Sequence, residues 1–391
     1  MTKHDVIVVG AGIAGASTAF FLAERGVDVG LVEMEHPASG PTGRSSAVTH
    51  AFYLQSELSR LAIAGVSTLR RLPELTGEAK VHTECGMMWA CGADAAPAWR
   101  AIAERITGEG SKIEALAPDD LARRAPGIDL DGIALALWEE DYGYGDPYGA
   151  TQALVKGARQ RGATVYLNSK VDRLVQSSGR IAGVETARQG RLAAPVVVSA
   201  AGVWTKPLIG ALGYDLPIHV ERHIMAVLDG QGRAHDVMPF SWCDDLLCNY
   251  ARPDGDRVIL CGVWAGGGTG IRHQTIARPE IIADPDHYRA DTDESECIDA
   301  LSFLLPRFPR LAELGVRPGY AGLYDMSPDD NPLIGPVPGI DGLFAICGSS
   351  GHGFKLGAGV GEEVARLVTE GRSELLAPFS LDRFTDRRRG G

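Results

Sequence analysis

The chain has 391 residues, of which 45% are hydrophobic and 23% are charged, a composition typical of a soluble globular protein with a full core. Its length predicts about two to three domains. Its net charge of −12 argues against nucleic acid or an anionic membrane as the main partner. No apolar run approaches the ~20 residues that a membrane span needs, so we expect no integral membrane segment.

The cysteines and the N-terminus both favour a cytoplasmic location. The first predicted strand starts a few residues after Met1, which leaves no room for a signal peptide. Seven scattered cysteines without a C-x-x-C pair indicate reduced thiols. Cys243 and Cys248 could form a redox pair, although two ordinary buried thiols are the simpler interpretation. The pattern suggests no metal site.

The N-terminal stretch predicts a strand, a glycine turn, a helix and a second strand. Asp5–Val9 is a short apolar run that ends in glycine. Ile13–Arg25 follows with helical periodicity, and Val27–Val32 has the apolar character of the next buried strand. This order is that of a dinucleotide-binding unit.

Three glycines in the turn follow the G-x-G-x-x-G pattern. Gly10 permits the tight turn, and Gly12 lets a pyrophosphate approach the backbone. Gly15 allows the helix to pack closely on the strand, while the helix start offers N–H groups and partial positive charge to phosphates. Glu33, at the end of the second strand, can accept hydrogen bonds from a ribose diol. A glycine turn without a ligand is the alternative.

The next segment, His36–Ser46, is rich in Pro, Gly and Ser and is expected to be a loop. It leaves the sheet at the end where ligands bind in such folds. Arg44, Ser45 and Ser46 are therefore candidates for phosphate or ring contacts, unless the loop is simply solvated.

The middle of the chain mixes helices with strands. Helices are expected at Gln55–Leu72, Pro97–Ile106 and Pro118–Arg124, and Asp141–Leu154 is expected to be a loop that runs into a helix. Strands are expected at Cys85–Ala90, Ala163–Leu167 and Pro195–Ala200, with Val171–Leu174 and Ile181–Glu185 forming a hairpin. The strand that ends in Ala201 and Gly202 would allow close approach of backbone and cofactor.

The second half begins with alternating, β-rich segments that indicate an antiparallel sheet. These segments are Pro217–Leu228, Leu246–Ala251 and Arg257–Trp264, interrupted at Gly266–Gly270. A helix is expected at Asp293–Leu304, a strand at Leu343–Cys347, a glycine turn at Gly348–Leu356, a helix at Gly357–Gly371 and a disordered basic tail at Arg387–Gly391.

Because α/β units lie on both sides of the β-rich segments, two interleaved domains are predicted. Residues 1–80, 145–215 and 316–391 would form one domain, and residues 81–144 and 216–315 the other.

Several motifs together resemble the superfamily of FAD-dependent D-amino acid oxidases and sarcosine oxidases, most closely its sarcosine oxidase branch. They are Gly10–Gly15 with Glu33, Gly43–Ser46, Ser199–Trp204, Gly322–Gly335 and Gly348–Lys355, and the resemblance covers nearly the whole chain. It implies a mixed α/β fold in which a Rossmann domain of the glutathione-reductase type binds FAD. An antiparallel β-sheet domain, interleaved with it, would bind the substrate.

The resemblance also implies where FAD lies. The adenosine half would lie on the first turn and Glu33, with Val171 and Gly202 beside the adenine. The Arg44 loop and the second glycine turn would surround the flavin and its ribityl–pyrophosphate chain. The cofactor residues expected are Gly10, Gly12, Ile13, Ala14, Gly15, Glu33, Met34, Arg44, Ser45, Ser46, Val171, Ala201, Gly202, Gly351, His352, Gly353, Phe354 and Lys355.

Lys355 matches the family lysine that binds a substrate carboxylate. A fixed cation beside a flavin could also stabilise negative charge as the flavin is reduced. A solvated lysine is the alternative, but a cation at a helix N-terminus opposes the dipole and needs a reason. His352 could touch the flavin or only complete the hydrogen bonds of the turn.

Three departures from the sarcosine oxidase pattern qualify the resemblance. Thr49 stands where that branch has an arginine, so one carboxylate contact is missing and N-methylglycine itself is a doubtful substrate. Gly322 replaces the cysteine that binds flavin covalently, so non-covalent FAD is expected. Tyr250–Arg257 lacks the lysine that activates oxygen, which leaves oxygen, a quinone or another carrier as electron acceptor.

The implied reaction oxidises a C–H bond next to the nitrogen of a small amine or amino acid, either N-methylated, secondary or of D configuration. Hydride passes to the flavin, and the resulting imine hydrolyses. The catalytic candidates are Lys355, His50, Tyr53, Arg222, Tyr250 and Tyr324, with His223 nearby. His50 could accept the amine proton or be an ordinary loop histidine. The tyrosines could line the pocket or pack in the core, and Arg222 could replace the missing clamp or be a surface residue.

Other functions stay open from the sequence. A pyridine-nucleotide disulfide reductase needs a second nucleotide fingerprint and an early cysteine pair, and a flavin hydroxylase needs a late Gly-Asp; neither pattern is found. A 2-hydroxy-acid dehydrogenase on the same scaffold is the closer alternative, followed by a non-catalytic flavoprotein subunit of a larger complex. The oligomeric state is not indicated.

Overall fold

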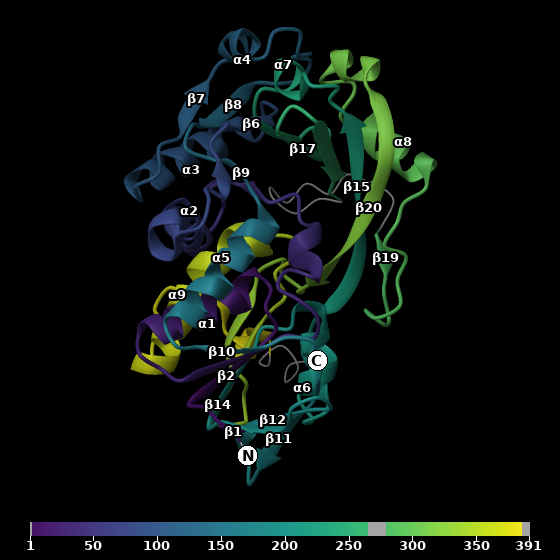
Figure 1. Cartoon of the computed structure of the whole chain (residues 1–391). Helices are drawn as coiled ribbons and strands as arrows, with labels where there is room; N and C mark the ends of the chain where they lie inside the picture. Colours follow the sequence, from purple (N-terminus) through teal and green to yellow (C-terminus); the bar gives the residue numbers. More distant parts are fainter. Residues whose placement is uncertain (1, 265–278, 385–391) are drawn as a thin grey trace, which may run out of the picture.

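The computed structural model describes residues 2–264 and 279–384, which fold around two large β-sheets stacked end to end (Figure 1). The lower sheet has six strands in the order β10-β3-β2-β14-β22-β21. The upper sheet contains nine strands in the order β19-β15-β18-β17-β16-β6-β8-β7, with β20 pairing with β15. Two smaller sheets have the orders β1-β13-β12-β11 and β4-β9-β5.

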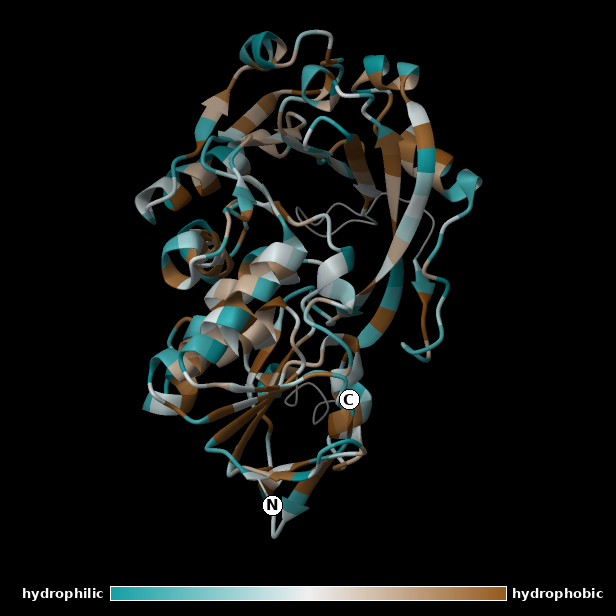
Figure 2. Ribbon diagram, in the orientation of Figure 1, coloured by the Kyte–Doolittle hydropathy of each residue, from teal (hydrophilic) through white to brown (hydrophobic). Residues whose placement is uncertain are grey.

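The six-stranded sheet is built from short apolar runs. Its strands are β10 (Thr164–Tyr166), β3 (Val29–Val32), β2 (Val6–Val9), β14 (Val196–Ser199), β22 (Leu343–Cys347) and β21 (Leu333–Pro336). All pairs are parallel except β21 with β22. Parallel strands are covered on both faces, which explains why the central strands carry almost no polar residue, and they are brown in Figure 2.

Helices α1 (Ile13–Glu24), α2 (Ser56–Thr76), α5 (Pro147–Gln160) and α9 (Gly353–Glu370) gather on one side of this sheet (Figure 1). The first and last of them pack closely, because the last helix presents glycines to the first. A Cβ on Gly357 would lie 2.6 Å from Ile13 Cγ2, and one on Gly361 would lie 2.3 Å from Ser17 Oγ. Helices from the N-terminal and C-terminal regions of the chain therefore pack against each other in the core.

The opposite face of the six-stranded sheet packs against the small sheet of β1 (Thr2–Lys3), β13 (Gly190–Ala193), β12 (Arg180–Thr186) and β11 (Val171–Ser177). β11 and β12 pair antiparallel, which confirms the predicted hairpin. The short helix α6 (Thr205–Gly210) follows β14 through a 3₁₀ turn.

The upper half is the large mixed sheet. Its strands are β19 (Glu280–Ile281), β15 (His219–Asp229), β20 (Gly315–Met326), β18 (Val258–Val263), β17 (Asn249–Asp254), β16 (Ser241–Asp244), β6 (Met87–Cys91), β8 (Leu135–Glu139) and β7 (Glu114–Leu116). Its helices are α3 (Ala96–Gly108), α4 (Pro118–Arg124), α7 (Ala234–Val237) and α8 (Glu294–Ser302). The strands β4 (Val48–Thr49), β9 (Gly143–Gly145) and β5 (His82–Thr83) form a small separate sheet.

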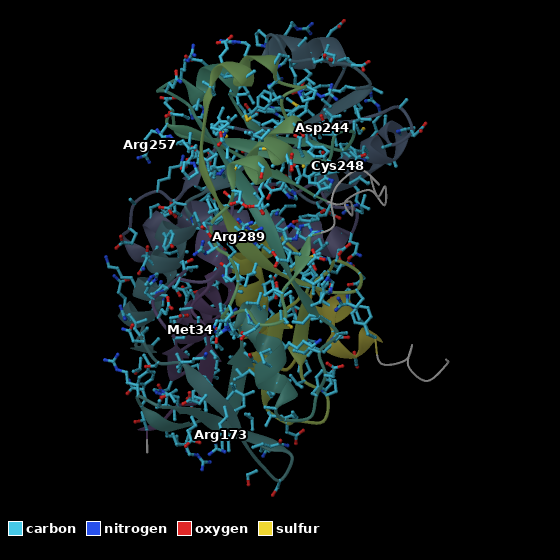
Figure 3. All side chains as sticks on the ribbon, turned by 90° about the vertical axis from the view of Figure 1, so that its right-hand side faces the viewer. Met34, Arg173, Asp244, Cys248, Arg257 and Arg289 are labelled. Atoms are coloured by element: carbon cyan, nitrogen blue, oxygen red, sulfur yellow. The ribbon has the colours of Figure 1, made fainter. Side chains whose placement is uncertain are left out.

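A buried ion pair joins strand β16 of the large mixed sheet to the segment after α8. Asp244 Oδ2 accepts a hydrogen bond of 2.8 Å from Arg307 Nε, and both side chains are almost fully buried. Figure 3 shows Asp244 and Cys248 in the upper half and Met34 in the lower half. Cys243 and Cys248 are buried free thiols, so they do not form a disulfide.

Most predicted elements are found, with boundaries shifted by a few residues. The clearest shift is at α9, which begins at Gly353 rather than Gly357 and so includes Lys355 in its first turn. The strands that were not predicted are β1, β4, β5, β7, β8, β9, β13, β16, β19, β20 and β21. The large sheet is also not purely antiparallel, because β16 pairs with β6 in parallel.

The interleaving of two domains stays a prediction, although β20 bears on one of its boundaries. β20 pairs with β15 along most of its length, so residues 315–326 extend the large sheet rather than the cofactor half. The other domain boundaries stay predictions. The predicted break at Gly266–Gly270 and the tail at Arg387–Gly391 lie outside the described residues. No helix within residues 2–264 and 279–384 combines the length and apolar content needed to cross a bilayer.

Candidate active site

A cavity of about 200 Å³ lies at the carboxyl ends of the central parallel strands. It is lined by most residues that the sequence assigned to the cofactor: Gly10, Gly12, Ile13, Ala14, Glu33, Met34, Arg44, Ser45, Val171, Ala201, Gly202, Gly351, Gly353 and Phe354. Segments from both ends of the chain and from its middle therefore meet here, and we name this space the nucleotide cavity.

The first glycine turn is shaped by close backbone packing. Gly10 has φ +96°, and a Cβ there would lie 2.6 Å from the Ala200 carbonyl oxygen. Gly15 does not line the cavity; a Cβ on it would lie 2.0 Å from the Gly10 oxygen, which confirms its packing role. Gly12, with an ordinary φ of −71°, lines the cavity, and a Cβ on it would lie 3.0 Å from Thr42 Oγ1.

Glu33 is held in place by backbone N–H groups. Its Oε2 accepts a hydrogen bond of 2.7 Å from Ala11 N, and its Oε1 accepts one of 2.9 Å from Glu35 N. The side chain is buried yet lines the nucleotide cavity. Such an oriented carboxylate is suited to a ribose diol.

Two helices begin at this cavity. α1 starts after Gly12 and α9 after His352, and neither helix has a side-chain cap. The first N–H groups of a helix lack intrahelical acceptors and carry partial positive charge, which suits an anion such as a pyrophosphate. The glycine turn, Glu33 and the two helix starts together fit a dinucleotide.

A second cavity, of about 1220 Å³, adjoins the first. The two share Ser45, Tyr324, Gly351 and Phe354 in their walls. Of the predicted residues, Ser46, His50, Tyr53, His223, Tyr250, Tyr324, His352 and Lys355 line this larger space, which we name the substrate cavity. Five of the six catalytic candidates are thus brought together.

Lys355 lies in the first turn of α9 and is 7% exposed, so it is not a solvated lysine. Burial lowers its pKa to about 8, although the nearby Cys243 and Glu139 partly oppose this effect. Its Nζ lies 6.0 Å from the centre of the Tyr53 ring. The site therefore holds a cation that has few protein partners and borders the cavity.

An aromatic wall stands beside Lys355. His50 packs on Tyr53 with ring centres 4.7 Å apart and meets the edge of Trp89 at 4.8 Å. The Tyr53 hydroxyl lies 3.2 Å from His352 Nδ1. Burial and then the Lys355 charge lower the pKa of His352 to about 3 and hold that of His50 well below its ordinary value. Both imidazoles are thus kept neutral.

Glu139 supports this wall from behind and was not foreseen from the sequence. Its Oε2 accepts a hydrogen bond of 2.7 Å from Ala51 N, and its Oε1 accepts one of 2.9 Å from Trp89 Nε1. It is fully buried, and burial raises its pKa to about 7. The segment 135–140 contains apolar residues followed by two glutamates, so no sequence signal marked this glutamate as the inward one.

The opposite wall is formed by β15, β17 and β20. The hydroxyls of Tyr250 and Tyr324 lie 3.3 Å apart, and burial raises the pKa of each above its ordinary value. Tyr250 also stacks on Trp264 with an interplanar angle of 13°. Both tyrosines line the cavity rather than only filling the core.

Arg222 does not reach either cavity, which contradicts its predicted role as a carboxylate clamp. It is buried, and its guanidinium donates to the carbonyl oxygens of Arg289 and Asp291 and to Glu296 Oε1, at 2.8, 2.8 and 2.9 Å. Strand alternation explains the error, because neighbouring residues face opposite sides of a sheet. Its neighbours Glu221 and His223 do line the substrate cavity.

Thr49, which replaces the family arginine, is also turned away from the cavity. Its hydroxyl lies 2.9 Å from His82 Nε2 and accepts a hydrogen bond of 3.0 Å from Gly143 N. Arg252 occupies the stretch that lacks the expected lysine, and its Nε donates to the Ser46 carbonyl at 2.5 Å. It therefore fixes the loop beside the cavity without entering it.

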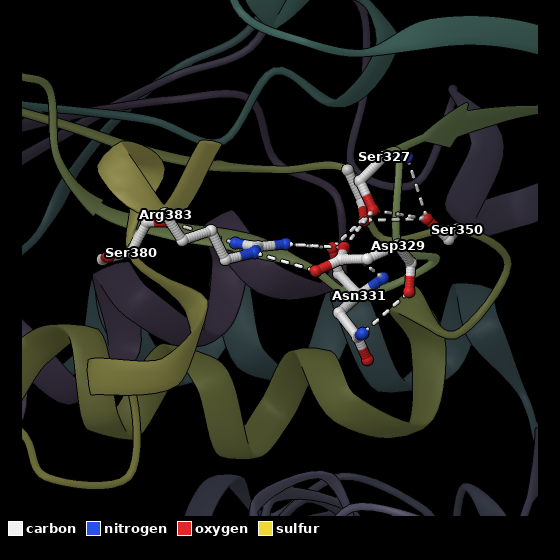
Figure 4. A network of polar contacts seen from close by, with 7 residues as sticks. Ser327, Asp329, Asn331, Ser350, Ser380 and Arg383 are labelled. Atoms are coloured by element: carbon white, nitrogen blue, oxygen red, sulfur yellow. Dashed lines mark hydrogen bonds and ion pairs between the residues drawn. The ribbon is translucent and has the colours of Figure 1, made fainter. Parts of the chain in front are cut away.

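The second glycine turn is anchored by carboxylates. Asp325 accepts hydrogen bonds from Gly348 N at 2.7 Å and Ser349 N at 3.1 Å. The network in Figure 4 continues outward, where Arg383 donates to both oxygens of Asp329 and Ser327 N donates to Ser350 Oγ. The turn is thus fixed between β20 and the C-terminal segment.

Residues 5–367 match the family model described as FAD dependent oxidoreductase. The chain belongs to this family. Membership makes the chain an enzyme that uses FAD as its cofactor, and the nucleotide cavity has the lining that FAD requires. The Rossmann-type α/β fold expected from the sequence is confirmed.

The individual relatives have low sequence identity to this chain. Human mitochondrial sarcosine dehydrogenase is 27% identical over 384 residues, or 95% of this chain, but the chain spans only 40% of that protein. N-methyl-L-tryptophan oxidase of Citrobacter koseri is 27% identical and is matched over its whole length, with 98% of this chain covered.

Two solved structures show the same fold. L-proline dehydrogenase from P. horikoshii superimposes with a TM-score of 0.86 at 23% identity, with 99% of each chain covered. Glycine oxidase from Geobacillus kaustophilus gives a TM-score of 0.80 at 22% identity, covering 98% of this chain and 99% of that one.

Proposed function

We propose that this FAD-dependent enzyme oxidises the C–N bond of a small amino acid, either N-methylated, secondary or of D configuration. The observation that carries the proposal is the buried Lys355 cation in the wall of the substrate cavity, next to the residues shared with the nucleotide cavity. A buried cation with a low-dielectric surrounding attracts a carboxylate strongly. The relatives named for N-methylated substrates agree with this choice.

In this proposal the residues of the chain bind and orient the substrate. Lys355 holds the carboxylate, so that the carbon bearing the amine lies near the wall formed by Tyr324 and Gly351. His50 lines the substrate cavity and is kept neutral by burial and the Lys355 charge, so its ring is suited to accept the amine proton. The aromatic wall of Tyr53 and Trp89 excludes water from the reacting carbon.

FAD, when bound, supplies the hydride acceptor for this oxidation. The residues we assign to it are those that line the nucleotide cavity, with Lys355, His352 and Ser46 at its junction with the substrate cavity. Oxygen, a quinone or another carrier then takes the electrons.

An anaerobic absorbance titration of the FAD-loaded protein tests the proposal. N-methyl amino acids, D-amino acids, cyclic imino acids and 2-hydroxy acids are added in turn, and bleaching by one amine class is expected. The rate at which colour returns in air then separates an oxidase from a dehydrogenase. Bleaching by no amine would contradict the proposal.

Lys355→Ala provides a second test. We expect it to weaken carboxylate-bearing substrates by about tenfold or more, since a buried charge-assisted contact is lost, and neutral amines far less. Lys112→Ala, which removes an exposed lysine, is the matched control. Equal losses for both substrate types would mean that Lys355 serves the flavin instead.

A 2-hydroxy-acid substrate is the second candidate. The neutral His50 ring in the cavity wall is suited to accept a hydroxyl proton as well as an amine proton. The same titration decides between the two, because the panel contains matched amino and hydroxy acids.

A further inference from the structure

Three polar residues of β15 face the substrate cavity and have no part in the function proposed above. His219, Glu221 and His223 alternate along the strand, so their side chains share one face of the sheet. Glu221 Oε1 lies 2.8 Å from His219 Nε2, and its Oε2 lies 3.0 Å from His223 Nε2. All three residues line the cavity, and we name them the β15 cluster.

The β15 cluster runs from the wall shared with the nucleotide cavity towards solvent. The His223 ring stacks on Tyr324 with centres 3.9 Å apart and planes at 17°. Tyr324 lines both cavities, and its Cα is the cross-strand partner of Glu221. His223 and Glu221 are 15% and 14% exposed, whereas His219 is 49% exposed. The cluster therefore reaches outward from the reacting end of the cavity.

The hydrogen bonds define what the cluster offers to a ligand. Burial opposes ionisation of Glu221, but hydrogen bonds from His223 and His219 hold its pKa below the ordinary value. In the tautomer that has its proton on Nε2, each ring donates to the Glu221 carboxylate, and its Nδ1 is left as an acceptor. No described residue donates a hydrogen bond to either Nδ1. The cluster thus presents negative charge and lone pairs.

The rest of the cavity strengthens this polarity. Asp245, Asp329 and Asp330 also line it, and Lys355 is its only lysine or arginine among the described residues. Among the described residues, Asp329 is paired with Arg383, whereas the ion pairs of Glu221 are with the two cavity histidines. His50 lines the same cavity, and its buried Nδ1 has no hydrogen-bond partner among the described residues. Among the described residues, no group of three or more His, Cys, Asp or Glu side chains could hold a metal ion, so the β15 cluster is not a metal site.

We propose that the β15 cluster is a subsite for a cationic, donor-rich group, an ammonium or guanidinium, at the far end of the amino-acid substrate. The proposal rests on the function proposed above, since it places the substrate carboxylate at Lys355. A substrate with a basic side chain would then have opposite charges at both ends of the cavity. A second carboxylate in the side chain would be repelled by Glu221.

The test uses the FAD-loaded protein and three substrates of matched length. They are Nα-methyl-lysine, its uncharged isostere 2-(methylamino)heptanoic acid, and 2-(methylamino)adipic acid, each as both enantiomers. Anaerobic bleaching gives an apparent Kd for each. We expect the basic substrate to bind about tenfold or more tightly than the neutral one, and the acidic one to bind most weakly.

Glu221→Gln should remove this preference while leaving the neutral isostere nearly unchanged, with FAD content and circular dichroism confirming the fold. Asp284→Asn is the matched control, because Asp284 is an exposed carboxylate that pairs with His287 and does not line the cavity. A preference for the neutral or acidic substrate, or the same preference in Glu221→Gln, would overturn the proposal.

Binding without turnover separates this proposal from the proposed function. 6-Aminohexanoate and hexanoate lack an α-amine, and their binding is followed by the change they cause in the flavin absorbance. If no substrate bleaches the flavin but 6-aminohexanoate binds more tightly than hexanoate in a Glu221-dependent way, only the proposed reaction fails. Equal binding of the two probes contradicts the cation subsite, whatever the reaction.

Discussion

At the scale of single residues, Lys355 lowers the stability of the folded protein but provides a charge that can bind a substrate carboxylate. A lysine in the first turn of a helix opposes the dipole, and here the side chain is also buried. Desolvation of a charge costs free energy unless a partner compensates. The folded protein therefore keeps a cation that a substrate carboxylate, rather than the protein itself, can satisfy.

Replacing Lys355 by methionine should stabilise the apoprotein. Burial lowers the pKa of Lys355 from 10.5 to about 8. At ~1.4 kcal/mol per pKa unit, this costs about 3 kcal/mol below pH 8. Between pH 8 and 10.5 the unfolded chain binds more protons, so wild-type stability rises with pH across this window. Urea unfolding at pH 7 and pH 10 should show Lys355→Met more stable at pH 7 and the difference smaller at pH 10.

Lys112→Met is the control for that measurement, because Lys112 is 73% exposed and forms an ion pair of 3.5 Å with the exposed Glu140. It should leave the unfolding midpoint nearly unchanged. An unchanged or lower midpoint for Lys355→Met at pH 7 would show that the buried cation is compensated by the protein.

Gly12→Val should prevent FAD binding. Gly12 has an ordinary φ, so the backbone tolerates a side chain, but the added atoms would enter the nucleotide cavity beside Thr42 Oγ1, 3.0 Å from the Cβ position. The flavin-to-protein absorbance ratio after purification measures the loss. Gly108→Val, at a glycine with no atom within 4 Å of its Cβ position, should keep FAD. Full occupancy in Gly12→Val would contradict the assigned path of the pyrophosphate.

The residues that could be predicted were those with a local signature. Gly10, Gly12 and Glu33 belong to a motif whose spacing carries its own geometry, and the structure places all three at the nucleotide cavity. Glu139 has no such signature, because its partners Ala51 and Trp89 are distant in sequence. Arg222 was misjudged for a similar reason, since a one-residue step along β15 reverses the face of the sheet.

At the scale of elements, the contact between α1 and α9 positions both helix starts. The glycines at 357 and 361 let the two helices approach until side chains of one touch the backbone of the other. Their N-termini consequently both lie at the nucleotide cavity. The start of α9 was predicted four residues late, because the glycine-rich run 348–359 resembles a turn until tertiary packing selects a helix.

Gly357→Ala should loosen this pair of helices. The new methyl group would lie 2.6 Å from Ile13 Cγ2 and 3.2 Å from Ala14 N, so the helices must separate. Overpacking of this kind costs about 1–3 kcal/mol and should also weaken FAD binding, because α1 moves. Urea unfolding and FAD titration measure the two effects. Gly108→Ala, in an open helical position, should be neutral or slightly stabilising; a similar result for Gly357→Ala would contradict the tight contact.

Strands β8, β16 and β20 were missed because their sequences lack a clear alternation. β20 contains Gly315, Pro318 and Gly319, residues that normally interrupt strands, yet it pairs with β15 over most of its length. Its register is set by the neighbouring strand rather than by its own pattern. The unexpected strand also shifts one predicted domain boundary.

At the scale of the whole molecule, Gly322 in the place of a cysteine predicts that FAD is held without a covalent bond at that position. Gly322 lines the nucleotide cavity and stands where the sarcosine oxidase branch has a cysteine. A Cβ on Gly322 would lie 3.4 Å from Arg44 Cβ. Acid precipitation should release FAD into the supernatant and leave a colourless pellet. A yellow pellet, with flavin on the denatured chain in a mass spectrum, would contradict this prediction.

The nucleotide cavity joins residues 9–45 to residues 346–354, near opposite ends of the chain. During synthesis, strand β22 and the start of α9 leave the ribosome only after more than 340 residues have been made. Until then β14 lacks its β22 neighbour, and α1 lacks the helix that packs beside it. The complete nucleotide cavity can therefore form only after β22 and α9 have been translated, and we expect flavin loading to follow that step.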